Sequence, residues 1–312
     1  MRPARNCRLQ IIRLQISVNG VLIIDKPRGM TSHDVVNCVR RILRQRSVGH
    51  LGTLDPSATG VLPIVVGHFT RLAQFYTDSD KKYEGVIRFG FATDTYDADG
   101  EATSASQNVI LNEEDVRRLA AEFRGVLRQI PPPFSAKKIA GVPAYKLARR
   151  HREVKLEPVQ VKVKALEILG VSGDCAEFRA HVGSGTYMRS IAHDMGQRLG
   201  CGAHLGRLRR TAVAEFTIEE AHTLGELETK VRQGRAEDIF FHPRKLLPQM
   251  PSVTATDENV ALIRTGRAVN LPEMSKAPLV KVFHGQRDLI AISTRIAGTL
   301  FHPSIVFPAS EG

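Results

Sequence analysis

The segment from residue 49 to residue 63 constrains the fold of this chain most, because it holds three glycines, two prolines and a single carboxylate. Glycine allows positive φ angles and proline fixes φ, so this composition predicts a shaped loop. Asp55 lies in the middle of the loop and is the only acidic residue between Asp34 and Asp78. An isolated acid of this kind is either a structural counter-charge or a reactive carboxylate, and the loop alone leaves both open.

The charge balance favours a polyanionic partner. Lys and Arg number 44 against 32 Asp and Glu, which gives the 312 residues a formal net charge of +12. Nucleic acid is the simplest partner for such an excess, and an ordinary basic surface is the alternative. No apolar run reaches the roughly 18 residues that a membrane-spanning helix needs, so we expect no membrane association.

The cysteines and histidines do not form a metal-binding pattern. No CxxC pair and no HExxH motif is present, so we expect no metal site. Reduced, mostly buried thiols in a cytoplasmic protein are the expected state of the four cysteines, which are Cys7, Cys38, Cys175 and Cys201.

The first 45 residues predict a basic extension, a strand and a helix. Residues 1–17 carry four arginines and lack the apolar core of a signal peptide, so they are interpreted as a basic N-terminal extension, with a mitochondrial-type presequence as the alternative. The apolar run 21–24 predicts a buried strand. A helix follows to about residue 46, and Thr31 with Asp34 forms its expected capping box. The arginines of this helix, Arg40, Arg41 and Arg44, are either a solvated face or an RNA contact.

Further along, the chain contains both strand patterns and helix patterns. Apolar alternation predicts strands, and amphipathic stretches predict helices. The predicted strands are 83–91, 159–163, 176–182 and 211–218, and the predicted helices are 69–76, 113–124, 218–231 and one ended by Gly200. Three prolines in 243–251 indicate a domain boundary near residue 250, and a hairpin pattern over 279–293 predicts a small β-rich module beyond it.

Two further segments resemble sites for phosphate groups. Residues 136–156 hold seven Lys or Arg and one acid, which is typical of a phosphate-gripping insertion or of a solvated surface helix. Gly183-Ser184-Gly185 precedes a helix and is able to bind phosphate there, although it lacks the third glycine of a dinucleotide fingerprint. From the residues alone, the interpretation stops at an RNA-modifying enzyme that acts through a carboxylate on an extruded base.

Several motifs, in order and with matching spacing over about 200 residues, resemble those of the TruB-type tRNA pseudouridine-55 synthases. The catalytic motif of that family is matched by the loop around Asp55, and four other family motifs are matched elsewhere. The matching segments are residues 50–60, 25–32, 80–83 with 93–97, 185–189 and 208–210. Leu51 and Met188 depart from the commoner family residues, and both changes are apolar. The extension before Val18 has no counterpart.

The resemblance implies a fold, a reaction and a partner. It implies an α+β pseudouridine-synthase fold with a central, largely antiparallel mixed sheet flanked by helices over residues 18–249. It also implies a thumb insertion over about 130–157 and a PUA-like C-terminal domain over 250–312. The implied activity is isomerisation of the uridine at position 55 in the T-arm loop of tRNA, by a cytoplasmic, monomeric enzyme that uses no cofactor and no metal.

The resemblance also implies roles for individual residues. Asp55 matches the catalytic aspartate, Tyr83 the catalytic tyrosine that stacks on the flipped base and assists proton transfer, and Arg189 the arginine that pairs with the aspartate. His50 matches the histidine that enters the T-loop in place of extruded nucleotides. The remaining matches are two pocket residues and two supporting residues of the first motif, namely Tyr187, Leu208, Lys26 and Pro27.

Two other functions remain compatible with these motifs. One is an RNA-folding protein in which Asp55 has no chemical role. The other is a pseudouridine synthase that acts on other RNA within a guide complex.

Overall fold

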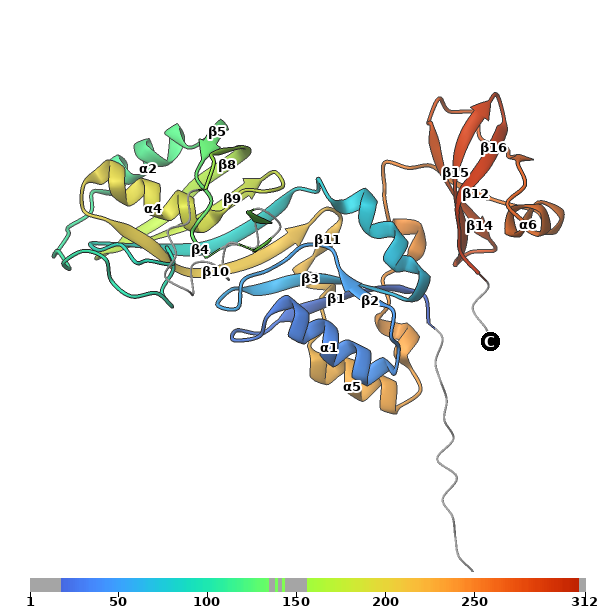
Figure 1. Ribbon diagram of the computed structural model, residues 1–312, viewed down its shortest axis with the longest axis horizontal. Helices are drawn as coiled ribbons and strands as arrows, with labels where there is room; N and C mark the ends of the chain where they lie inside the picture. The colour runs from blue at the N-terminus through green and yellow to red at the C-terminus, as the bar shows by residue number, and fades with distance from the viewer. Residues whose placement is uncertain (1–17, 135–137, 140–141, 144–155, 309–312) are drawn as a thin grey trace, which may run out of the picture.

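The computed structural model describes residues 18–134, 138–139, 142–143 and 156–308, and contains two main sheets (Figure 1). The larger sheet has nine strands and the smaller, C-terminal sheet has five. A separate two-stranded sheet pairs β6 (Lys138–Ile139) with β7 (Val142–Pro143). Within the described residues, no helix is long and apolar enough to cross a bilayer.

The nine-stranded sheet is mixed but almost entirely antiparallel. Its order is β1 (Gly20–Lys26), β3 (Thr59–Val66), β10 (Ala203–Val213), β4 (Lys81–Phe89), β9 (Cys175–Val182), β8 (Val159–Ser172) and β5 (Gly125–Gln129). The short strands β2 (Val48–His50) and β11 (Phe216–Thr217) pair with β3 and β10. Only the β3–β10 pair is parallel, and it joins β1, β2 and β3 to the rest of the sheet.

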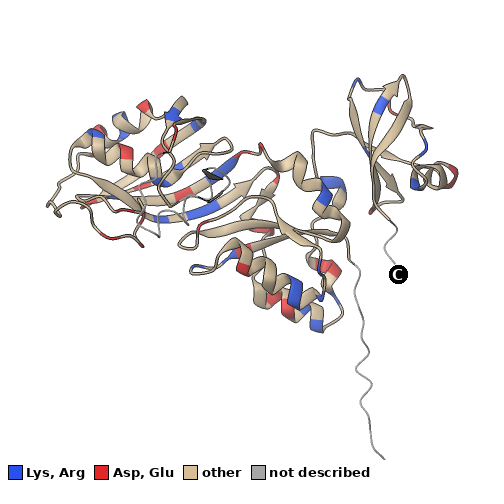
Figure 2. Cartoon of the chain, viewed as in Figure 1, with Lys and Arg blue, Asp and Glu red and all other residues tan. Residues whose placement is uncertain are grey.

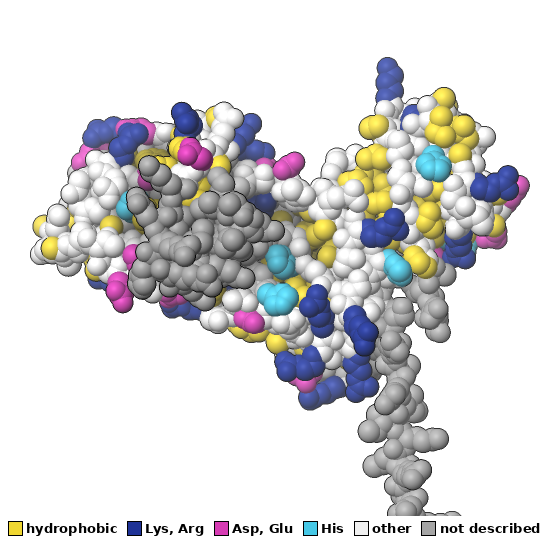
Figure 3. Space-filling view, viewed as in Figure 1, with side chains coloured by type: hydrophobic (Ala, Val, Ile, Leu, Met, Phe, Trp, Pro, Cys, Tyr) yellow, Lys and Arg dark blue, Asp and Glu magenta, His cyan; other side chains and the backbone are white. Residues whose placement is uncertain are grey.

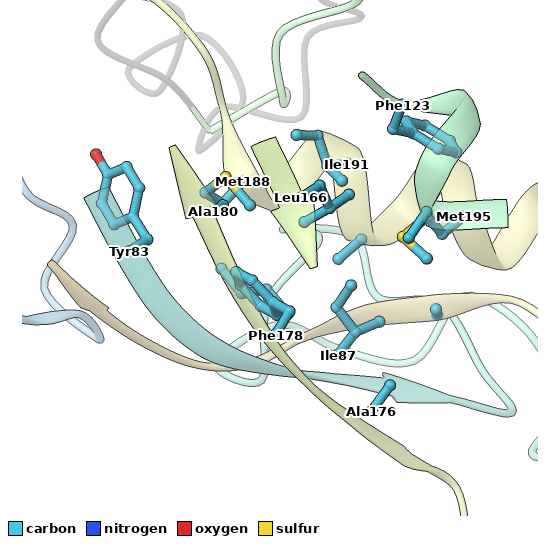
Figure 4. Packing of buried hydrophobic residues seen from close by; sticks show 14 of the residues in the cluster. Tyr83, Ile87, Phe123, Leu166, Ala176, Phe178, Ala180, Met188, Ile191 and Met195 are labelled. Carbon is cyan, nitrogen blue, oxygen red and sulfur yellow. The ribbon is translucent and has the colours of Figure 1, made fainter. Parts of the chain in front are cut away.

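Helices cover the sheet at both ends (Figure 1). At one end, α1 (Ser32–Leu43) and α5 (Leu224–Arg232) share a buried apolar cluster with β1 and β3. At the other end, α2 (Glu113–Glu122) and α4 (Met188–Leu199) pack on β4, β8, β9 and β10. Figure 4 shows this second cluster, with Phe178 and Ile87 below and Met195 and Phe123 on the helix side.

The C-terminal residues form a second, smaller body. The five-stranded sheet contains β12 (Ser252–Thr254), β13 (Val269–Asn270), β14 (Leu279–His284), β15 (Asp288–Ala297) and β16 (Leu300–Val306), with α6 (Asp257–Arg264) packed beside it. Its apolar side chains join those of the larger body in one buried cluster, in which the rings of Phe69 and Phe307 lie 5.2 Å apart. The two bodies are therefore packed together rather than linked by chain alone.

The expected α+β architecture is confirmed, including the largely antiparallel sheet and the β-rich C-terminal body. The capping box of α1 is present, since the hydroxyl of Thr31 accepts from the Asp34 amide and the Asp34 carboxylate accepts from the Thr31 amide. The helix after the Gly183 turn also ends at Gly200, whose φ of 73° needs glycine.

Three local predictions are corrected. The strand expected over 211–218 begins at Ala203, because bulges at 205/207 and 210/212 break the alternation of apolar residues. The helix expected over 218–231 is split into η2 (Ile218–Glu220) and α5, because Thr223 starts a new capping box. The segment expected as the helix 69–76 is a 3-10 helix, η1 (Gly67–Tyr76).

The remaining short helices lie before the C-terminal body, namely η3 (Ala236–Ile239) and η4 (Pro243–Lys245). The expectation of mostly buried thiols is wrong for two of the described cysteines. Cys201 is buried, whereas Cys38 and Cys175 are half-buried, and all three are free thiols. Cys7 and most of the basic segment 136–156 lie outside the described residues.

Candidate active site

The loop that carries Asp55 is held between two strands that pair with each other. β2 and β3 run antiparallel, with His50 opposite Ile64, and the Leu51 amide donates to the Pro63 carbonyl at 2.9 Å. Gly52 and Gly60 have φ angles of 125° and 103°, which side chains rarely adopt. At Gly60 a Cβ atom would lie 2.2 Å from the Arg210 carbonyl oxygen, so glycine is required there for close contact as well as for φ. The glycines thus give the loop its shape, as the sequence predicts.

Asp55 and Arg189 come from distant parts of the chain and meet in space. Nε of Arg189 lies 2.9 Å from Oδ2 of Asp55, although the contact lacks the alignment of a hydrogen bond. The Asp55 side chain keeps 36% exposure, whereas that of Arg189 keeps only 6%. The buried guanidinium therefore fixes one side of a carboxylate whose other side faces open space.

Arg189 is itself held in place from several directions. It is the second residue of α4, and its Nη1 and Nη2 atoms donate to the carbonyls of Thr95 and Phe134 at 3.2 and 3.1 Å. Nη1 also lies 3.7 Å from Oδ2 of Asp97. Burial raises the pKa of the Asp97 carboxyl, and the Arg189 charge opposes that rise. With this many partners, the guanidinium has little freedom to move away from Asp55.

A cavity of about 260 Å³ opens beside Asp55. This volume is near the lower limit for ligand pockets, so it suits one nucleoside rather than a larger cofactor. Five of the eight residues that the resemblance implies line it, namely Asp55, Tyr83, Tyr187, Arg189 and Leu208. Among the described residues, no group of three or more His, Cys, Asp or Glu side chains is placed to hold a metal ion.

Tyr83 lies in β4 at the border between the apolar core and the cavity. Its side chain is 8% exposed and belongs to the cluster formed by β4, β8, β9 and β10. In Figure 4 its ring lies at the edge of that cluster, and its hydroxyl points away from the other labelled residues. An aromatic ring at this position can replace the stacking that a base loses on leaving an RNA loop.

Tyr187 is positioned by a residue that the sequence analysis missed. Gln129, at the end of β5, accepts from the Tyr187 amide at 2.8 Å and donates to the Tyr187 carbonyl at 3.0 Å. The Gln129 side chain is only 3% exposed. A single Gln in an irregular, proline-rich region carries no sequence signal for this role, because both of its contacts lie 58 residues away.

Lys26 does not line the cavity, but it is hydrogen-bonded to the loop that carries Asp55. Its ammonium donates to the carbonyls of Pro27, Met30 and Pro56 at 2.9, 2.7 and 3.2 Å, and Pro56 directly follows Asp55. Burial lowers the pKa of Lys26 to about 8, while the Asp55 charge partly opposes the shift. Pro27 is exposed and does not line the cavity. The first motif therefore supports the loop rather than forming the cavity wall.

Ser32 is hydrogen-bonded to the same loop at Leu54. Its hydroxyl accepts from the Leu54 amide at 2.8 Å and donates to the Leu54 carbonyl at 3.0 Å. Because Ser32 is the first residue of α1, the start of that helix is fastened directly to the residue before Asp55.

Arg210 is a buried cation to which the sequence analysis gave no role. It is 1% exposed and donates to the carbonyls of Val61, Thr53 and Gly52 at 2.8, 3.0 and 3.1 Å. The sequence places it in a basic segment beside Leu208, and only the structure shows that its guanidinium fills the inside of the loop that carries Asp55. Lys81 also lines the cavity without having been predicted, and burial lowers its pKa.

His50 lies at the foot of the loop and outside the cavity. It is half-buried, and its Nδ1 accepts from the Gly52 amide at 3.3 Å. Burial and the nearby Arg210 charge lower the pKa of the imidazole, which favours its neutral form. The structure thus places His50 at the start of the loop that carries Asp55, outside the cavity.

Comparison with known proteins identifies the family. The N-terminal domain model of the TruB family pseudouridylate synthases matches residues 40–188, and the C-terminal domain model of tRNA pseudouridylate synthase B matches residues 189–250. The tRNA pseudouridine synthase B of Solibacter usitatus is 49% identical over 292 residues, which cover 93% of this chain and 100% of that protein. The enzyme of the same name from Dehalococcoides mccartyi is 37% identical over 290 residues, covering 93% and 97%.

Solved structures agree with this assignment. An H/ACA ribonucleoprotein bound to a substrate RNA containing 2'-deoxyuridine holds a chain that is 25% identical, with a TM-score of 0.70 over 96% of this chain and 88% of that one. A chain of the archaeal box H/ACA Nop10-Cbf5 complex is 26% identical, with a TM-score of 0.68 over 97% and 90%. The chain described here therefore belongs to the TruB family of pseudouridylate synthases.

Proposed function

We propose that this chain converts the uridine at position 55 of tRNA, in the T-arm loop, to pseudouridine, with Asp55 as the essential carboxylate. The observation that carries this proposal is the ion pair between Asp55 and the buried Arg189 in the wall of a nucleoside-sized cavity. No other described carboxylate lines that cavity.

The reaction is an isomerisation that needs no external reactant. The N1–C1′ bond of the uridine breaks, the uracil turns, and a C5–C1′ bond forms. The C5 proton is then lost, and N1 gains a proton. Three roles for Asp55 are compatible with the geometry, namely attack at C1′, attack at C6, and removal of a ribose proton. Each requires a carboxylate that is held in a fixed position, and the buried Arg189 guanidinium, whose Nε lies 2.9 Å from Oδ2 of Asp55, holds it there.

The other site residues would bind the RNA. Tyr83 would stack on the extruded base, Tyr187 and Leu208 would line its pocket, and His50 would occupy the space that the extruded nucleotides leave. Lys26 and Pro27 would support the catalytic loop from the first motif. We assign the substrate contacts of the T-arm to this face of the molecule.

We also propose a division of the chain into domains. Residues 18–249 would be the catalytic domain, residues 250–312 a PUA-like domain, and residues 1–17 a basic extension. The basic segment within 130–157 would act as a thumb that closes on the T-arm, so trimming residues 138–152 should weaken tRNA binding and flatten its salt dependence. We propose that the enzyme works as a monomer in the cytoplasm, without a guide RNA; the relatives named tRNA pseudouridine synthase B support a tRNA substrate.

The decisive experiment is an Asp55→Asn variant assayed with tRNA that carries 5-tritiated uridine. Tritium release should stop while binding of a T-arm stem-loop survives, because the amide keeps the size of the carboxylate but not its charge. Glu122→Gln is the matched control, since Glu122 forms an exposed ion pair with Arg198 on the far helices. Full turnover by Asp55→Asn would refute the catalytic role of Asp55. Absence of pseudouridine in tRNA treated with the unmodified protein would refute the function itself.

A further inference from the structure

Four arginines surround an open cavity at the C-terminal end of α1. We name Arg40, Arg41, Arg44 and Arg46 the α1 arginine cluster. The cavity has a volume of about 510 Å³, and its wall is completed by only two other residues, Asn37 and Gln45. No acidic residue lines it, so no carboxylate in the wall of the cavity balances the four positive charges.

The α1 arginine cluster lacks the ion pairs that other helical arginines of this protein make. Arg117 and Arg118 on α2 pair with Glu113 and Asp115, and Figure 2 shows acidic and basic residues side by side on that helix. In the described part of the chain, by contrast, no member of the cluster pairs with a carboxylate, and the guanidinium groups of Arg44 and Arg46 make no hydrogen bond or ion pair.

Helix stabilisation does not account for the whole cluster. Cations in the last turn of a helix interact favourably with its dipole, and Arg40 and Arg41 occupy that turn. Arg44 is the C-cap residue, and Arg46 lies beyond it. Arg40 also has a structural contact, because its Nη2 donates to the Val48 carbonyl at 2.9 Å, yet its Nε is buried with no partner among the described residues. Arg44 and Arg46 in particular are left available for a ligand.

The position of the cluster connects it to the proposed RNA-binding face. The α1 helix begins at Ser32, which is bonded to Leu54 of the catalytic loop, and its 12 residues extend about 18 Å. At its far end Arg40 is bonded to Val48, and Val48 is only two residues before His50 in β2. In the space-filling view, Lys and Arg side chains gather along the lower edge of the face over α1 and α5 (Figure 3).

We propose that the α1 arginine cluster binds phosphodiester groups in the double-stranded stem that flanks the target loop. The inference rests on the proposed function, and it adds a contact surface outside the nucleoside cavity. Guanidinium groups match the geometry of phosphate oxygens, and an unpaired group of them gains most from an anionic ligand. Paired RNA presents its phosphates on the outside, where exposed arginines can reach them.

The test uses the full-length triple variant Arg41→Gln/Arg44→Gln/Arg46→Gln. Arg40 is kept because of its bond to Val48, and the three altered side chains are exposed. The matched control is Arg117→Gln/Arg118→Gln/Arg198→Gln, which removes the same charge from arginines that have acidic partners. The Kd for a tRNA transcript is measured over a series of salt concentrations, and kcat is measured at saturating tRNA.

We expect the triple variant to bind tRNA about tenfold more weakly than the control, and its log Kd to depend on log salt with a slope smaller by about 2. The kcat at saturating tRNA should match that of the control, because the cluster does not touch the reacting base. A Kd and a slope equal to those of the control would overturn the proposal. Should the triple variant fail to fold, the single variants Arg44→Gln and Arg46→Gln give the same readout at smaller amplitude.

A second arm locates the contact. With a T-arm RNA whose stem is shortened, the difference between the triple variant and the control should disappear, whereas an undiminished difference would contradict binding to the stem. Inorganic phosphate at millimolar concentration should compete only weakly, and strong competition would indicate a small-anion site instead. These binding measurements do not depend on catalysis. The proposal for the α1 arginine cluster can therefore be refuted while pseudouridine is still formed, and the proposed function can be refuted while the cluster still binds RNA.

Discussion

Two fully buried lysines, one in each body of the molecule, use the same physical device for different purposes. Lys26 in β1 is 0% exposed and Lys281 in β14 is 1% exposed. Each ammonium is bonded to backbone carbonyls of an irregular segment. Lys26 donates to two carbonyls of the first motif and to the Pro56 carbonyl in the loop that carries Asp55. Lys281 donates to the carbonyls of Arg244 and Leu246, which precede the C-terminal body.

The surroundings of the two lysines differ. Burial lowers the pKa of both, but the charge that opposes this shift is Asp55 for Lys26 and Glu215 for Lys281. Lys26 therefore couples its three carbonyls to the carboxylate that we propose to be catalytic, whereas Lys281 couples the connecting segment to Glu215. The comparison teaches that a buried ammonium can organise a loop wherever several carbonyls converge, and that its neighbours decide whether chemistry or stability depends on it.

The largest effect is expected for Lys26→Met. Methionine fills a similar volume but leaves the three carbonyls without a donor, so the loop should shift around Asp55. A displacement of about 1 Å at a reacting group can reduce the rate about 100-fold, and we expect a fall in kcat of that order. Tritium release at saturating tRNA measures it.

Lys281→Met is the control for that measurement, since it removes the other buried ammonium. Its kcat should stay close to that of the unmodified protein. An equal loss of kcat in both variants would contradict the claim that Lys26, unlike Lys281, positions the loop that carries Asp55.

The contrast also explains which features the sequence could predict. Asp55 and Arg189 follow from the resemblance, since both lie in short motifs of fixed spacing, and the structure brings them within 2.9 Å. Arg210, Gln129 and Lys281 could not be predicted as buried positioning residues. A charged or amide side chain in a sequence is expected at the surface, and its partners here are backbone carbonyls and amides far along the chain.

Strand boundaries show a similar limit. Residues 205–210 contain three arginines, so they are interpreted as a basic segment rather than a strand. In the structure they lie in the middle of β10, where bulges turn Leu208 and Arg210 into the site. Sequence alternation identifies regular strands, but a bulge shifts the side chains between faces and hides the pattern.

The second prediction is that Lys281→Met lowers the free energy of unfolding by about 3 kcal/mol. The change leaves two buried carbonyls without their donor, and each unsatisfied group costs about 1–3 kcal/mol. Urea denaturation measures this loss. A surface change such as Lys276→Met, at an exposed residue, should have little effect. An equally small effect of Lys281→Met would show that the connecting segment is held by its apolar contacts alone.

The third prediction concerns pH and tests the state of Lys26. Its pKa is about 8 in the folded protein and about 10.5 in the unfolded chain, so the unfolded chain binds more protons between these values. Stability from this group therefore rises with pH in that window, by about 2 kcal/mol between about pH 7.5 and about pH 9.5. The unfolding free energy of Lys26→Met, measured beside the unmodified protein, should lack this part of the rise. Parallel pH profiles for the two proteins would contradict a lowered pKa.

The smallest effect is expected for Tyr76→Phe, at the junction between the two bodies. The Tyr76 hydroxyl donates to Oε1 of Glu215 at 2.5 Å, and the same oxygen accepts from the Leu247 amide at 2.8 Å. Losing a hydrogen bond to a charged acceptor should lower the free energy of unfolding by about 1.5 kcal/mol without changing kcat.

Because Glu215 also acts on Lys281, the two changes should not be additive. A double-mutant cycle with Lys281→Met should give a coupling free energy of about 0.5 kcal/mol or more, whereas distant sites add without coupling. The same cycle between Tyr76→Phe and Lys26→Met should give none, since Lys26 faces the catalytic loop. Coupling to Lys26 as strong as that to Lys281 would mean that the junction and the catalytic loop form one network rather than two.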